Sequence, residues 1–116
     1  MITPEEFLAY RKKYIYDVID GIAKQKQHDY SGTKGDMLKN IRAAESIGIP
    51  AQVAVIIRLQ DKLNRLGNLL VMRWQTGEGP AVKNESIRDT TLDAIQYLSF
   101  VDALEAEETN GGKLPQ

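Results

Sequence analysis

The feature that most constrains the fold is an apolar pattern of helical period that runs through nearly the whole chain. It is strongest between residues 50 and 75, where apolar residues step by three and four positions and so share one stripe of a helix. These residues are Ile56, Leu59, Leu63, Leu66 and Leu70. Pro50 suits the start of this helix, and Gly77, Gly79 and Pro80 interrupt the pattern after it.

A first helix is expected over about 4–28. Thr3, Pro4 and Glu6 form the sequence of a capping box with proline at the first helical position. The helical stripe that follows consists of Phe7, Tyr14, Val18 and Ile22. Residues 29–35 have the composition of a loop. A short helix over about 36–47 is expected to end at Gly48.

The fourth helix is expected to begin at Asn84 and to run through about residue 106. Its core-facing stripe consists of Ile87, Ala94, Ile95, Leu98 and Val101. No β alternation and no internal repeat is found in the 116 residues. The prediction is an all-α, four-helix bundle-like single domain over 1–106, followed by a flexible tail over 107–116. A helical chain this short is expected to form a homo-oligomer, by default a symmetric dimer or tetramer.

Composition excludes several classes of protein. Fifteen basic against sixteen acidic residues give a net charge of -1, which disfavours nonspecific nucleic-acid binding. The absence of cysteine excludes disulfides and thiolate sites, and a single histidine, His28, excludes multi-histidine metal centres. The first residues do not resemble a signal peptide and no apolar run suggests a membrane span, so a cytoplasmic protein with no membrane partner is expected.

Two charged stripes lie opposite the apolar ones. The stripe on the third helix consists of Arg58, Asp61, Arg65 and Asn68, with Lys62 beside them. Glu85, Asp89 and Asp93 follow one another at one-turn intervals on the fourth helix, where stacked carboxylates repel each other. Solvent, arginines from another helix or a divalent cation would offset that repulsion. Charged faces are often simply solvated, and two stripes of opposite sign can also pair with each other.

Apolar side chains accompany both charged stripes. They are Leu69 and Met72 on the third helix and Leu92, Tyr97 and Phe100 on the fourth. A purely solvated face would not need them, so each helix is expected to have a second, partly buried face. This is the pattern expected where subunits associate around a polar site. Such a site would suit a metal on its carboxylates and phosphate on its arginines.

The segment after the first helix is a second candidate region. Tyr30 offers a ring on which a nucleobase can stack, and Lys24, one turn before His28, can reach a phosphate. The alternative is a turn with a half-buried tyrosine and a structural or exposed histidine.

Taken in order, four blocks of sequence resemble the nucleotide modification associated domain 1 family, a small all-helical family found largely in bacteriophages. The blocks are Lys24 to Gly32, Asn40-Ile41, Arg58 to Leu70 and Glu85 to Tyr97. The resemblance covers about residues 15–104 and implies a role in nucleotide metabolism. Its most specific part is the pairing of Asp-Lys-x-x-Arg (61–65) with Glu-Ser-Ile-x-Asp-Thr-x-x-Asp (85–93).

The helical pattern is also similar to the all-α NTP pyrophosphatases of the MazG and dimeric dUTPase type. Those enzymes bind Mg²⁺ through a Glu-x-x-Glu pair on one helix and a Glu-x-x-Asp pair on the next. By this resemblance Glu85, Asp89 and Asp93 would act as the second pair. Where the first pair is expected, the chain has Arg58, Asp61, Lys62 and Arg65. That set is better suited to binding phosphates than to holding two magnesium ions.

Three functional hypotheses follow. The first is a nucleotide-binding protein that recognises and sequesters a nucleotide or nucleotide-derived signal, as small phage proteins do in anti-defence, in the cytoplasm of the infected host. Its expected ligand-binding residues are Lys24, His28, Tyr30, Arg58, Asp61, Lys62, Arg65, Asn68, Asp89 and Asp93. The second is a Mg²⁺-dependent nucleotide pyrophosphatase that holds the metal on Glu85, Asp89 and Asp93. The third is a protein–protein adaptor whose charged stripes merely pair.

Overall fold

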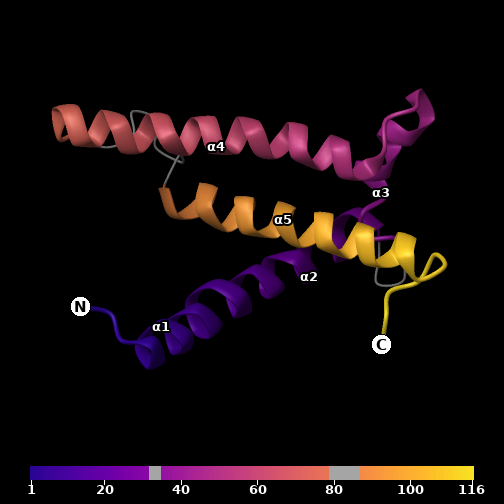
Figure 1. The fold of residues 1–116 in the computed structure, drawn as a ribbon, viewed down its shortest axis with the longest axis horizontal. Coiled ribbons are helices and arrows are strands. Elements are labelled where there is room, and N and C mark those ends of the chain that lie inside the picture. The colour runs from indigo at the N-terminus through magenta and orange to yellow at the C-terminus, as the bar shows by residue number, and fades with distance from the viewer. Residues whose placement is uncertain (32–34, 79–86) are drawn as a thin grey trace. The chain divides into compact units, whose positions relative to one another are not determined.

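The computed structural model describes residues 1–31, 35–78 and 87–116, with only the backbone described over 27–31. Every regular element in this part of the chain is a helix, so the predicted all-α class is confirmed (Figure 1). The elements are α1 (Pro4–Tyr10), η1 (Arg11–Tyr16), α2 (Asp17–Ser31), α3 (Lys39–Arg42), η2 (Ala43–Ile47), α4 (Ala51–Thr76) and α5 (Ile87–Thr109). They belong to two compact units, Met1–Lys39 and Asn40–Gln116.

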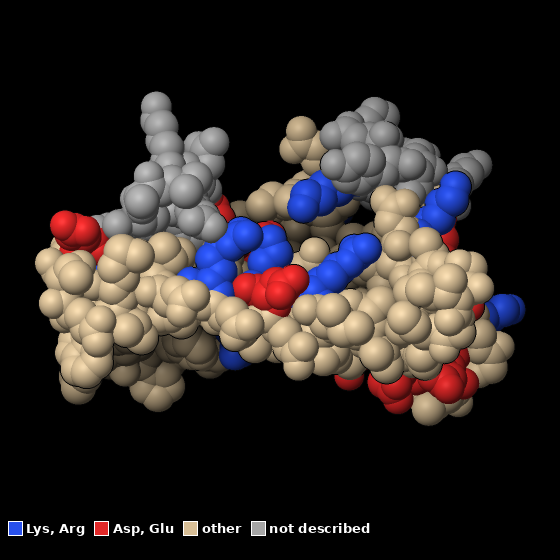
Figure 2. Space-filling model, turned by 90° about the horizontal axis from the view of Figure 1, so that it is seen from above, with Lys and Arg blue, Asp and Glu red and all other residues tan. Residues whose placement is uncertain are grey.

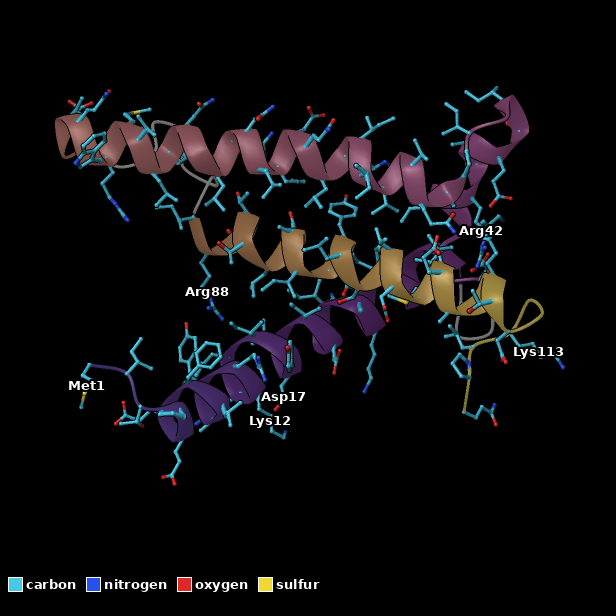
Figure 3. All side chains as sticks on the ribbon, viewed as in Figure 1. Met1, Lys12, Asp17, Arg42, Arg88 and Lys113 are labelled. Atoms are coloured by element: carbon cyan, nitrogen blue, oxygen red, sulfur yellow. The ribbon has the colours of Figure 1, made fainter. Side chains whose placement is uncertain are left out.

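In the first unit, α1, η1 and α2 form one uninterrupted helix whose start is as predicted. The Thr3 hydroxyl accepts a hydrogen bond from the Glu6 backbone N–H at 3.1 Å, and the Glu6 carboxylate accepts one from the Thr3 N–H at 3.4 Å. The central segment η1 winds as a π-helix. Its wider turn brings residues five apart together, so Lys12 Nζ lies 3.2 Å from Asp17 Oδ2 (Figure 3).

The end of this helix differs from the prediction. We expected a loop over 29–35, but α2 continues through Ser31. Asp29, Tyr30 and Ser31 include no glycine or proline, and each residue added to a formed helix gains a backbone hydrogen bond without a new nucleation step. The rest of the predicted loop over 32–34 lies outside the described residues.

The short second helix begins later than expected and tightens along its length. It was predicted over 36–47, whereas α3 begins at Lys39 and passes into the 3₁₀ segment η2. The Asp36 carboxylate accepts a hydrogen bond from the Leu38 N–H at 3.0 Å just before it begins. Gly48 ends it with φ of 83°, the left-handed conformation that favours glycine.

The long helix α4 follows its prediction within a residue at each end. Pro50 precedes it, and Gly77 ends it with φ of 75° while donating its N–H to the Arg73 carbonyl at 2.9 Å. α5 runs antiparallel to α4 and packs against it along much of its length (Figure 1). The predicted N-cap of α5, Asn84, lies outside the described residues.

The face of α4 that is buried differs from the predicted leucine stripe. The buried residues of α4 are Ala51, Val55, Leu59 and Leu69, and Val55 is fully inaccessible at 0% exposure. Of the predicted stripe, Leu59 is buried and Leu66 half-buried, whereas Ile56, Leu63 and Leu70 are exposed. The predicted stripe runs along the border of the packed face, so only the side chains that turn toward α5 are covered.

The predicted core stripe of α5 is corrected in a similar way. Ala94 is buried and Ile87, Ile95 and Val101 are half-buried, but Leu98 is 53% exposed. The other buried residues of α5 are Thr90, Leu92 and Leu104. Because burial extends around much of α5, its apolar residues do not form one narrow stripe.

The boundary expected at residue 107 also differs from the structure. α5 continues to Thr109, and Glu107 accepts two hydrogen bonds from the Arg42 guanidinium at 2.9 and 3.0 Å. Gly111, with φ of 70°, then reverses the chain so that the Gly112 N–H bonds back to the Glu107 carbonyl at 2.9 Å. Glu107 therefore belongs to the packed helix and not to a tail.

We predict that Leu59→Ala lowers the free energy of unfolding by about 2–4 kcal/mol, because it leaves a cavity between α4 and α5. Leu98→Ala is the matched control, with the same atoms removed from an exposed position, and its effect should stay within about 0.5 kcal/mol. Urea denaturation followed by circular dichroism measures both. Equal effects of the two substitutions would contradict the packing described above.

Candidate functional site

One lysine lies within the packed face of α4. Ala51, Val55, Leu59, Lys62, Leu66 and Leu69 follow one another in steps of four and three, so they share the side of α4 that faces α5. Lys62 Nζ donates a hydrogen bond to Asp93 Oδ2 on α5 at 3.2 Å. The side chains are 26% and 44% exposed, respectively, so this ion pair is half-buried at the edge of the interface.

A second polar contact joins the same two helices further along. The Gln52 amide donates hydrogen bonds to the carboxylates of Glu105, at 3.0 Å, and Glu108, at 2.8 Å. Lys62 follows Gln52 along α4, whereas Asp93 precedes Glu105 along α5. The two contacts therefore fix the antiparallel register, and with it the position of the α4 cations relative to the α5 carboxylates.

The charged stripe of α4 lies next to Lys62. Arg58, Asp61, Arg65 and Asn68 are all exposed, and at about 100° per residue they occupy the side of α4 adjoining Lys62. Figure 2 views the molecule from above α4 and shows basic side chains gathered around acidic ones in the middle of that face. The predicted clustering of these α4 residues with Lys62 on one side of the helix is thus present.

On α5 the acidic stripe contributes two described carboxylates. Asp89 and Asp93 are one turn apart on the same side of the helix, and Asp89 is exposed. Glu85, the third predicted metal ligand, lies outside the described residues. In the part of the chain that the structure describes, no group of three or more His, Asp or Glu side chains is arranged to hold a metal.

The chemistry of these groups fits Mg²⁺ only together with a ligand. Magnesium in nucleotide sites is commonly bound by one or two carboxylates plus the phosphates of the substrate, with water completing the octahedron. Asp89 and Asp93 supply two such carboxylates, while Lys62 pairs with Asp93 and Arg58 and Arg65 lie one turn to either side of Lys62 on α4. The arrangement suits a metal that arrives with phosphate more than a resident metal held by protein alone.

The predicted apolar companions of the stripes are largely covered within the single chain. Leu69 and Leu92 are buried and Tyr97 and Phe100 half-buried, and the two rings meet edge to face with centroids 6.1 Å apart. Met72 is exposed. Because Leu69 and Leu92 are already buried in one chain, their apolar character does not require a second subunit.

The three candidates in the first unit form a separate prediction. Lys24 lies exposed on α2. His28 and Tyr30 also belong to α2, and their side chains lie outside the described part of the chain. The backbone is helical at both residues, as predicted for His28 but not for Tyr30, which was expected in a loop, so any contact with a base would be made from a helix end.

An ion pair near the other end of the α4–α5 pair was not predicted from the sequence. The Arg42 guanidinium binds both oxygens of Glu107, and Figure 3 shows Arg42 beside the C-terminal part of α5. An open pocket of about 390 Å³ adjoins this ion pair, lined by Arg42, Glu45, Pro50, Ala51, Gln52, Leu104, Glu107 and Glu108. Its carboxylates disfavour an anionic ligand. Since Arg42 and Glu107 are far apart in the sequence, no local spacing signals their contact.

Comparison of the chain with protein-family models, with curated proteins and with solved structures finds no match. None of the described helices is both long enough and apolar enough to cross a membrane.

We predict that Lys62→Met and Asp93→Asn each lower the free energy of unfolding of the α4–α5 pair and that their effects are not additive. A double-mutant cycle should give a coupling energy of about 0.5–1 kcal/mol, as expected for a partly exposed ion pair. The cycle is measured by urea denaturation at low ionic strength and repeated in high salt, which should reduce the coupling. Additive effects would show that the contact between Lys62 and Asp93 contributes nothing to stability.

Proposed function

We propose that the chain is a nucleotide-binding protein that takes up a nucleotide or nucleotide-derived signal at the charged edge of the α4–α5 pair. This charged edge consists of Arg58, Lys62, Arg65, Asp89 and Asp93. The observation that carries the proposal is the half-buried ion pair of Lys62 with Asp93. Its placement beside Arg58, Arg65 and Asp89 puts donors for phosphate and acceptors for hydroxyl or metal within one region. The resemblance described above points to the same class of ligand.

Each group can take part in such binding. Arginine offers a planar fork that matches phosphate oxygens, and lysine offers a compact charge. A carboxylate cannot bind phosphate directly, but it accepts hydrogen bonds from ribose hydroxyls and from base N–H groups, and it binds Mg²⁺. A nucleotide carries all of these partners, whereas a simple anion carries only the phosphate.

The ion pair of Lys62 with Asp93 affects which anions can bind, because an anion that binds Lys62 has to replace Asp93 as its partner. A phosphate that takes Lys62 must leave Asp93 with another partner, because an unpaired, partly buried carboxylate is unfavourable. A ribose hydroxyl or a phosphate-bound Mg²⁺ supplies that partner, whereas inorganic phosphate has only its own P–OH group to offer. We therefore expect nucleotides to bind more tightly than phosphate.

The second candidate, a Mg²⁺-dependent pyrophosphatase, is favoured by Asp89 and Asp93, which lie one turn apart with cations opposite. In that case the two carboxylates would hold the metal and Arg58, Lys62 and Arg65 would neutralise the phosphates. The third candidate, an adaptor, is favoured by the observation that Lys62 and Asp93 already pair between helices. In that case the charged edge has only a structural role.

One incubation separates the three candidates. Protein in molar excess is mixed with NTPs, dNTPs, cyclic dinucleotides and ADP-ribose derivatives, with Mg²⁺ or with EDTA, and free and heat-released ligands are read by mass spectrometry. We expect one ligand to leave solution and to return intact on heating. A monophosphate formed only with Mg²⁺ would indicate the pyrophosphatase, and a pool that stays free and unchanged would leave the adaptor.

With the ligand so identified, we predict that Arg58→Ala weakens binding about tenfold, the loss expected for one charge-assisted phosphate contact. Lys113→Ala is the control, because it also removes one positive charge, but from the segment after α5, outside the proposed site. Isothermal titration of the folded variants gives the dissociation constants. An equal loss in both variants would mean that only the overall charge matters.

A further inference from the structure

A third face of α4 is neither packed on α5 nor charged. Between Val53 and Trp74 it comprises ten positions, none of which holds a charged residue, although five charged residues lie elsewhere on this helix. The ten are Val53, Ile56, Ile57, Gln60, Leu63, Asn64, Gly67, Leu70, Val71 and Trp74. At about 100° per residue they cover an arc of about 140° that continues along most of the helix.

The apolar members of this face are exposed to a degree that is unusual for large side chains. Leu63 is 50% and Trp74 is 82% exposed, and Val53, Ile56, Ile57, Leu70 and Val71 are also exposed. Together they present on the order of 600 Å² of apolar surface, at the upper end of what monomers show and close to the roughly 800 Å² that each partner contributes to a standard interface.

We propose that this face binds the same face of a second copy of the chain, with the two α4 helices antiparallel. With a two-fold axis between Leu63 and Asn64, each of the ten positions lies opposite another of the ten on the second copy. The face is then complementary to itself, so that residue i contacts j while j contacts i, as in a two-fold dimer.

Side-chain size favours the antiparallel arrangement over the parallel one. In the antiparallel pair the large Trp74 meets the small Val53, and Gln60 meets Gly67. In a parallel pair Trp74 would meet its own copy and two glycines would face each other across a gap. Interfaces pack as densely as protein interiors, so large against small is the better fit.

Gly67 supports a close approach of two helices at this face. Glycine inside a helix is destabilising relative to alanine, and a Cβ built at Gly67 meets nothing within 4 Å in the described part of the chain. Packing among the described residues therefore gives no reason for glycine there. In the antiparallel pair the space is taken by Gln60 of the second copy.

A dimer formed in this way leaves the charged edge accessible. The apolar face is centred well over 90° around α4 from Arg58 and Arg65, so each copy keeps its own charged edge. The inference therefore does not rest on the proposed function, and its tests need no nucleotide.

The first test is the oligomeric state. Sedimentation velocity of the full chain from micromolar to millimolar concentration should show a monomer–dimer equilibrium, and Leu63→Glu should abolish the dimer while circular dichroism stays unchanged. Leu98→Glu is the matched control at an equally exposed leucine of α5 and should leave the dimer intact. A chain that stays monomeric throughout, or a dimer that survives Leu63→Glu, overturns the proposal.

A second test gives the geometry without disturbing the core. Because the chain has no cysteine, single cysteines report contacts directly under mild oxidation. Asn64→Cys lies next to the two-fold axis, close to its own copy, and should cross-link to itself, and a mixture of Gln60→Cys with Gly67→Cys should form the mixed dimer in preference to either homodimer. Efficient homodimers of Gln60→Cys alone would show a parallel pair, and no cross-link at any position would overturn the interface.

Discussion

The packing of α4 against α5 is the constraint on which the rest of the second unit depends. Val55 is completely covered, and Ala51 and Ala94 are small enough for the two helix backbones to approach closely. Leu59, Leu69, Leu92 and Leu104 are buried as well, and burial of apolar surface stabilises the pair by roughly 25 cal/mol per Å². The polar contacts along the edges, from Lys62 to Asp93 and from Gln52 to Glu105, add little energy but select one register.

The sequence predicted where α4 begins and ends, but not which of its faces is turned toward α5. Pro50 and Gly77 mark the ends of the helix through local backbone chemistry, which a sequence reveals directly. The orientation depends on which of two adjoining apolar faces meets α5. The stripe chosen from periodicity runs along their common border, so it contains Leu59 from one face and Leu63 from the other.

The same reasoning applies to the candidate site. The charged stripe of α4 follows from spacing alone, and Arg58, Asp61 and Arg65 do lie together. The partial burial of Lys62 was not predicted, because a lysine is assigned to solvent by its chemistry, yet Lys62 shares the packed face of α4 and is only 26% exposed. The contact of Arg42 with Glu107 was not predictable either, since it joins segments that only the tertiary fold brings together.

Under the proposed function, Lys62 would link stability to binding because it stands where the packed face of α4 meets the charged one. A ligand that takes Lys62 replaces the ion pair with Asp93, and it must offset the stabilisation that this pair provides. If that is about 1 kcal/mol, the apparent affinity is about fivefold weaker than the contacts alone would give. A ligand that also occupies Asp93, through a hydroxyl or a metal, avoids this loss. The ion pair would thus favour a ligand with two kinds of group over a bare anion.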